Sequence, residues 1–174
     1  MRGLSPVWLL AGAVAGFGAT LPMTLAMLAL HRRLPWHERY ALPPRQITLR
    51  LAERFGLRRK MGEPARSGAT LAAHFGYGAL MGAAYAPLAK GLPVPRAASG
   101  VGFGLAAWAG SYFGWLPAAG LLSPPTDHPG RRNALMIAAH LLWGAAAGLL
   151  LDLAEDAARE AADEGQAPRY RTGR

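Results

Sequence analysis

Two histidines in similar, charge-free surroundings are the first candidates for chemistry. His74 stands in Ala-Ala-His-Phe-Gly-Tyr-Gly, and His140 stands in Ala-Ala-His-Leu-Leu-Trp-Gly, 66 residues further along the chain. Imidazole changes its charge near neutral pH, forms hydrogen bonds and ligates metals. Because each histidine lies six residues into its predicted helix, we expect both rings about 9 Å from the same membrane boundary.

Two roles fit this pair without a cofactor. In the first, both imidazoles are neutral, hydrogen-bond to neighbouring helices and so specify helix packing. In the second, His74, His140 and Tyr77 line a pathway for protons or a solute. The hydroxyl groups predicted to pair with the histidines are those of Thr20, Thr24, Ser111 and Tyr112.

A third role is axial ligation of one haem between the two histidine-bearing helices. His74 and His140 would supply the ligands at equal depth. Gly78 and Gly144, four residues further on, would leave room for a flat ring. This hypothesis makes the chain a b-type cytochrome or a redox subunit.

Other catalytic chemistry finds little support in the residue types. The chain has no cysteine, which excludes disulfides, cysteine-ligated metals and cysteine nucleophiles. It has no Ser-His-Asp set, phosphate-binding loop or zincin motif, and no carboxylate in its apolar segments. Four loop residues could converge, but their spacing matches no metal motif: His31, His37, Asp127 and His128. We therefore predict no enzyme activity, no metal and no cofactor.

The elements that carry these residues are indicated by the distribution of charge. The net charge is +9 and 52% of the residues are hydrophobic, yet four long segments contain no Asp, Glu, Lys or Arg. A bilayer core of about 30 Å needs about 20 apolar residues in a helix, and charges inside it are costly. The sequence predicts an all-α, polytopic membrane protein, a small bundle of four transmembrane helices within 1–155. The predicted spans are 7–30, 68–88, 98–122 and 134–154.

The long loop 31–67 is predicted to contain a basic amphipathic helix. Pro43 and Pro44 suit its start and Gly56 suits its end, with an apolar stripe between them. Its basic residues are expected to contact anionic lipid, or else they are solvated and only set topology. The predicted lipid contacts are Arg45, Arg50, Arg54, Arg58, Arg59 and Lys60. No recognition motif indicates a nucleic-acid partner.

The basic residues also predict an orientation. Twelve Lys and Arg lie on the first and third loops, and four lie near the membrane on the other side. The positive-inside rule therefore places both loops in the cytoplasm and both termini outside. Residues 156–174 are expected to form an acidic helical extension followed by a disordered tail.

Glycines four residues apart indicate closely packed helices. The pairs are Gly12/Gly16, Gly78/Gly82, Gly100/Gly104, Gly110/Gly114 and Gly144/Gly148. One or two of these faces are candidates for a homodimer interface. The constant offset of 66 around the histidines also suggests two parallel hairpin repeats, although matches between the first and third spans give inconsistent offsets of 86 and 95.

The order of these features resembles the YagU-like family of small bacterial inner-membrane proteins. The resemblance rests on Pro43-Pro44-Arg45, on the segment 116–125 (Leu-Pro-Ala-Ala-Gly-Leu-Leu-Ser-Pro-Pro) and on Ala139-His140-Leu141-Leu142-Trp143, and it covers about residues 7–155. It implies a small helical bundle in the inner membrane, and it lends no biochemical activity.

Taken together, the sequence favours a non-enzymatic structural or interaction subunit that packs through glycine-rich helix faces. We expect it to contact anionic lipid of the inner leaflet and to form a homo-oligomer or join a larger membrane assembly. The alternatives are a small transporter or proton-conducting protein that uses the two histidines, and the haem protein described above.

Overall fold

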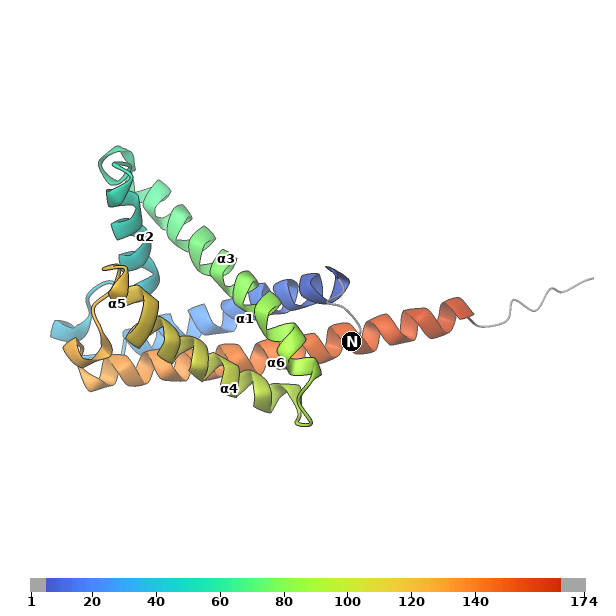
Figure 1. Ribbon diagram of the computed structural model, residues 1–174. Coiled ribbons are helices and arrows are strands. Elements are labelled where there is room, and N and C mark those ends of the chain that lie inside the picture. Colours follow the sequence, from blue (N-terminus) through green and yellow to red (C-terminus); the bar gives the residue numbers. More distant parts are fainter. Residues whose placement is uncertain (1–5, 167–174) are drawn as a thin grey trace, which may run out of the picture.

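The computed structural model describes residues 6–166, and side chains up to residue 160. All regular structure in this part of the chain is helical, as predicted (Figure 1). The helices are α1 (Pro6–His31), α2 (Pro43–Arg54), α3 (Glu63–Lys90), α4 (Arg96–Ala109), α5 (Leu116–Ala118) and α6 (Gly130–Gln166). Short helical turns are η1 (Trp36–Glu38), η2 (Arg58–Lys60), the π-helix η3 (Gly110–Trp115) and η4 (Pro125–Asp127).

Two of the described helices are long and apolar enough to cross a membrane: α1 and residues Gly130–Glu160 of α6. Helix α3, with 28 residues, is longer than α1, but His74, two tyrosines and several glycines lower the mean hydropathy of α3. Helix α4 has only 14 residues. The all-α prediction is confirmed, whereas the four spans stay a prediction.

The third predicted span, a continuous helix over 98–122, is wrong in its second half. Helix α4 passes into the π-helix η3, where Gly114 has φ −105° and ψ −109°. Pro117 then lacks the N–H that a continuing helix needs, and α5 ends at Ala118. Gly120, with φ +61°, turns the chain toward the next loop.

The bundle consists of two hairpins, α1 with α3 and α4 with α6, joined along α1 and α6 (Figure 1). Glycines bring the backbones of each hairpin into direct contact. The residues that meet are Gly12 with Gly82, Gly16 with Gly78, Arg96 with Gly148, and Gly100 with Gly144. Both crossings therefore share one register, with an offset of 84 between α1 and α4 and of 66 between α3 and α6.

This register corrects the offsets of 86 and 95 that short sequence matches suggested. It also shows where the predicted glycine faces go, because eight of these ten glycines pack within the chain. For the remaining pair, Gly110 and Gly114, an added Cβ atom would meet nothing within 4 Å. Duplication of an ancestral hairpin stays a prediction, now with a consistent alignment.

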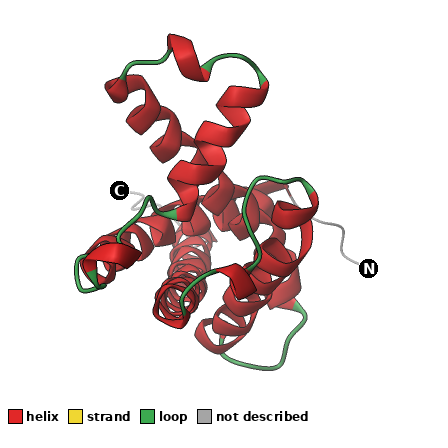
Figure 2. Cartoon of the chain, turned by 90° about the vertical axis from the view of Figure 1, so that its left-hand side faces the viewer, coloured by secondary structure: helices red, strands yellow, loops and turns green. Residues whose placement is uncertain are grey.

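The first and third loops lie at one end of the bundle, and the start of α1 and the extension of α6 lie at the other (Figure 1). Pro43 begins α2 and Gly56, with φ +67°, follows its end, as predicted. The end of α2, η2 and the start of α3 project from the rest of the bundle (Figure 2). Helix α6 continues to Gln166, and the rest of the predicted tail lies outside the described residues.

Ionic contacts tie α4 to the extension of α6. Arg96 contacts Asp152 at 2.9 Å and also Glu155, and Arg159 pairs with Glu155 at 2.7 Å. Burial alone raises the pKa of the Glu155 carboxyl, but the hydrogen bond and charge of Arg96 outweigh it and hold this pKa below its ordinary value. The ionised carboxylate therefore stabilises the α4–α6 hairpin.

The glycine register predicts opposite effects for two neighbouring substitutions. In Gly100→Ala the new Cβ would lie 2.9 Å from the carbonyl carbon of Gly144, so we expect destabilisation by about 1–3 kcal/mol. In Gly102→Ala the new atom meets nothing within 4 Å, and better helix propensity should stabilise by about 0.5–1 kcal/mol. Thermal unfolding of both variants in detergent measures the difference, and equal melting temperatures would contradict the register.

The Glu155 contact predicts loss of stability in acid. Since its folded pKa is lowered, its contribution is present above the ordinary value of 4.5 and disappears as the pH falls through that value and then through the folded one. Glu155→Gln should therefore melt earlier at pH 7 and show a shallower loss on acidification. Asp156→Asn, at a residue that is largely exposed, is the control. A parallel pH profile for wild type and Glu155→Gln would refute the role of this carboxylate.

Candidate functional site

A cavity of about 280 Å³ lies between the two hairpins and contains both histidines in its lining. Helices α1, α3, α6 and the π-helix η3 form most of its walls, α4 contributes Ala107, and α2 contributes Pro43, Ile47 and Leu51. The lining residues include no Asp, Glu, Lys or Arg. His74 and His140 thus share one cavity, and the equal depth and the roles expected for them stay predictions.

The side chain of His140 has a defined hydrogen-bonding state. Its Nδ1 lies 2.7 Å from the carbonyl oxygen of Met136, one turn earlier in α6. Because a carbonyl oxygen only accepts, Nδ1 must donate, and Nε2 of the neutral ring is left as an acceptor. The ring of Tyr112 meets His140 edge-on, with centroids 6.1 Å apart. Met136, not a hydroxyl group of another helix, therefore orients this imidazole.

The side chain of His74 is less well satisfied. Its Nε2 is buried and has no hydrogen-bond partner among the described residues. Three residues further on, the Tyr77 hydroxyl pairs with the Ser111 hydroxyl at 3.1 Å across the cavity. Ser111 is thus used by Tyr77, not by a histidine as predicted.

The two threonines predicted to pair with the histidines bond elsewhere. Thr20 donates to the carbonyl of Gly16 at 2.8 Å and accepts from Trp143 Nε1 at 3.3 Å. Thr24 donates to the carbonyl of Thr20 at 2.6 Å. Thr20 lines the cavity, whereas Thr24 does not. The hydroxyls of Thr20, Thr24 and Ser111 therefore have other partners than the histidines.

The clearance expected for a haem is also absent at the two glycines that suggested it. Gly78 packs against Gly16 and Thr20 of α1, and Gly144 packs against Gly100 of α4. Both glycines serve close helix packing, and although Gly78 also borders the cavity, its packed side is filled by Gly16 and Thr20. This geometry argues against haem ligation by His74 and His140.

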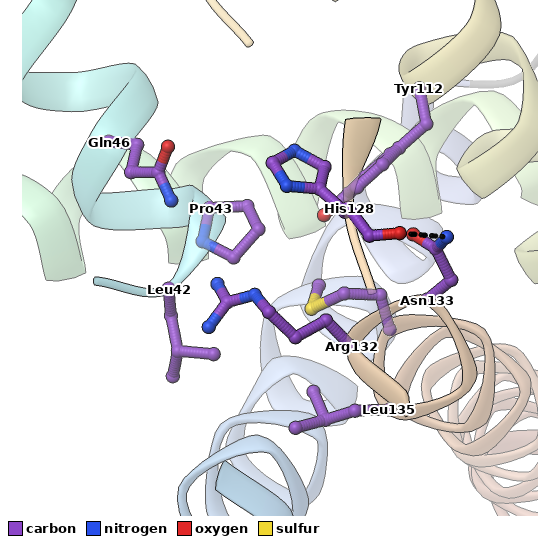
Figure 3. A pocket seen from close by; sticks show the side chains of 9 residues that line it. Leu42, Pro43, Gln46, Tyr112, His128, Arg132, Asn133 and Leu135 are labelled. Atoms are coloured by element: carbon purple, nitrogen blue, oxygen red, sulfur yellow. Dashed lines mark hydrogen bonds between the residues drawn. The ribbon is translucent and has the colours of Figure 1, made fainter. Parts of the chain in front are cut away.

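A second cluster, the Arg132 clamp, consists of Arg132 together with Tyr40 and the backbone of residues 38–41. Arg132 is only 5% exposed. It donates to the carbonyls of Glu38 (2.7 Å), Tyr40 (3.0 Å) and Ala41 (3.0 Å), and its guanidinium lies 3.5 Å from the Tyr40 ring centroid. Figure 3 shows Arg132 directed at the segment before α2, near Leu42 and Pro43. The clamp thereby fixes the start of α2 beside the cavity.

Tyr40 also joins two of the four loop residues that were expected to converge. Its hydroxyl lies 2.7 Å from His128 Nδ1, and its carbonyl accepts from His31 Nε2 at 3.0 Å. Burial, and then the charge of Arg132, lower the pKa of His128. No group of three or more potential metal ligands occurs in the part of the chain that the structure describes.

Four of the six predicted lipid contacts have protein partners. Arg45 pairs with Glu63 at 2.6 Å and Arg58 with Glu53 at 2.8 Å. Arg50 and Arg54 reach the carbonyls of Gly120 and Ala119, beyond the end of α5. For the side chains of Arg59 and Lys60 no hydrogen bond or ion pair is found within residues 6–160, although the Lys60 backbone N–H donates to the Leu57 carbonyl. These four arginines therefore make contacts within the chain, and their contact with lipid stays a prediction.

Sequence reasoning missed Arg132 and Tyr40 as positioning residues. The available signal was position, because Arg132 directly precedes the last charge-free segment and follows a loop rich in proline. Comparisons with protein-family models, with curated proteins and with solved structures give no match for this chain. The YagU-like resemblance therefore stays a prediction.

The clamp predicts different effects for two adjacent arginines. Lysine cannot reproduce the forked donors of Arg132, so Arg132→Lys should cost about 1–3 kcal/mol of stability and expose Arg39 to trypsin. Arg131→Lys, at a side chain that is 71% exposed, should change neither property. Melting temperature and the rate of cleavage within residues 32–42 are the measurements. Similar cleavage rates for the two variants would show that the clamp does not hold this segment.

Proposed function

We propose that this chain is an integral membrane protein with four spans, which lie within α1, within α3, in the segment from α4 to α5, and over residues 134–154 of α6. The support is an apolar stripe along α1 whose side chains are 45–73% exposed, a surface that water would not favour. The stripe consists of Val7, Leu10, Val14, Phe17, Leu21, Leu25 and Leu28. Exposed leucines on α3 and α6 extend this surface around the bundle.

We further propose a bacterial inner-membrane location with the first and third loops in the cytoplasm. The excess of Lys and Arg on these loops supports this orientation, and the YagU-like resemblance supports the location. Arg59 and Lys60, on η2 at the tip of the part that stands away from the bundle, are the candidates for contact with anionic headgroups (Figure 2).

We propose that the function is non-enzymatic binding of a small, uncharged, membrane-soluble molecule in the cavity. The observation that carries this proposal is a space of about 280 Å³ that is mostly apolar but contains both histidines. Ligand pockets combine apolar walls with a few polar groups in this way. The absence of charged side chains from the described lining favours an uncharged ligand.

Two other roles remain as second candidates with specific support. Transport gains support from α2, because part of the cavity is lined by this short helix and not by a span. An interaction subunit or homo-oligomer would need a surface other than the eight paired glycines, since these pack within the chain. The apolar stripe of α1 is the candidate surface for such association.

Filling the cavity tests the binding function. Ala107 lines the cavity and its neighbour Ala106 is exposed on the outside of α4, so Ala107→Phe and Ala106→Phe form a matched pair. We expect native mass spectrometry of wild type and Ala106→Phe, purified in nanodiscs, to show one retained small molecule. Ala107→Phe should lose it because the phenyl ring occupies its space.

The folded state of both variants is checked by thermal unfolding in the same nanodiscs. Retention of the molecule by Ala107→Phe, or its absence from wild type, would remove the basis for a binding function. Loss from both phenylalanine variants would place the molecule in the lipid-exposed surface and not in the cavity.

A further inference from the structure

Of the imidazole nitrogens in the cavity, Nε2 of His74 is buried without a partner within the described residues, and Nε2 of His140 is left as an acceptor. His140 donates through Nδ1 to Met136, so its Nε2 is an acceptor whose only complement is a donor. The buried Nε2 of His74 is also unpaired. Buried polar atoms normally find partners, and an unpaired one costs free energy. The ligand is therefore expected to bring at least one hydrogen-bond donor.

The walls around these nitrogens suit an aromatic ring. Tyr77, Tyr112, Trp115 and Trp143 all line the cavity. Aromatic side chains pack favourably against another ring by stacking or edge-to-face contact. Because no acidic or basic residue lines the cavity, a charged ligand would lack a counter-charge.

We infer that the ligand is a neutral aromatic ring that carries a hydroxyl group, a phenol or a hydroquinone. Its hydroxyl donates to Nε2 of His140, and the ring packs among the aromatic side chains. A second ring oxygen, in a hydroquinone, is the natural partner for Nε2 of His74. This inference rests on the binding function proposed above and specifies its ligand.

Other membrane-soluble classes satisfy the cavity less well. A molecule with only acceptor groups, such as an ester or a ketone, leaves Nε2 of His140 unpaired. A carboxylate would be held as an anion without a cation nearby. An aliphatic alcohol could donate, but it would not use the aromatic walls.

Two redox-inert probes test this ligand class. 4-Propylphenol carries the hydroxyl donor, whereas 4-propylanisole has a methyl ether in its place and cannot donate. Equilibrium binding is measured on the full chain in nanodiscs, and empty nanodiscs correct for partition into lipid. We expect wild type to bind the phenol about tenfold more tightly, the value of one additional hydrogen bond in a dry site.

Histidine variants assign the preference to its residue. His140→Leu should bind both probes equally, because the acceptor is lost while the volume is nearly kept. His37→Leu is the matched control, since His37 is exposed and lies outside the cavity, and it should keep the tenfold preference. The comparison of the two probes on wild type stands by itself if His140→Leu fails to fold.

The outcomes separate the ligand class from the binding function. Equal binding of phenol and ether by wild type overturns the ligand class and leaves the binding function in place. If neither probe binds while wild type retains a small molecule that Ala107→Phe loses, the ligand class is again wrong. If wild type binds neither probe and retains no molecule, both proposals fail together.

Discussion

At the two hairpin crossings, main chain meets main chain, since Gly12, Gly16, Gly78 and Gly82 leave no side chain between α1 and α3. In a bilayer, where burial of apolar surface adds little, such close approach is the main source of helix–helix attraction. It restricts each pair of helices to one register and one distance. The position of the cavity depends on where along the helices these backbone contacts end.

The contacts stop at different points in the two hairpins. The shared register aligns Thr20 of α1 with Gly104 of α4, and His74 with His140. Gly104 lets α4 lie against the backbone at His140, whereas the Thr20 hydroxyl occupies the space over Gly78. Because the Thr20 side chain stands between the helices there, α3 diverges from α1 on the N-terminal side of Gly78 (Figure 1). The loss of symmetry at this one position opens the cavity beside His74.

Much of this fold follows from local sequence signals, and the errors have physical causes. The proline and glycine at the ends of α2 act through their own backbone preferences, so its bounds were predictable. Gly110 and Gly114 have the same spacing as the packing glycines, and only the φ and ψ angles of Gly114 separate a break from a contact. The spacing of the glycines also does not show whether the helix packed against them belongs to the same chain or to a second copy. The glycine faces therefore suggested a dimer, whereas eight of these glycines pack within the chain. The partner of His140 is the backbone carbonyl of Met136 in its own helix. Every residue has such a carbonyl, so the sequence pattern does not distinguish this partner from a hydroxyl group on another helix.

The break at Gly114 also explains why two arginines of the basic first loop bind carbonyl groups of the protein itself. The broken segment ends at Ala118 and presents the carbonyls of Ala119 and Gly120 to α2. Arg50 and Arg54 satisfy these acceptors at a helix C-terminus, where cations are favoured. Pro43, Ile47 and Leu51, on the same side of α2 as these two arginines, line the cavity. Arg50 and Arg54, which the sequence predicts as lipid contacts, thus also anchor α2, the helix that lines part of the cavity.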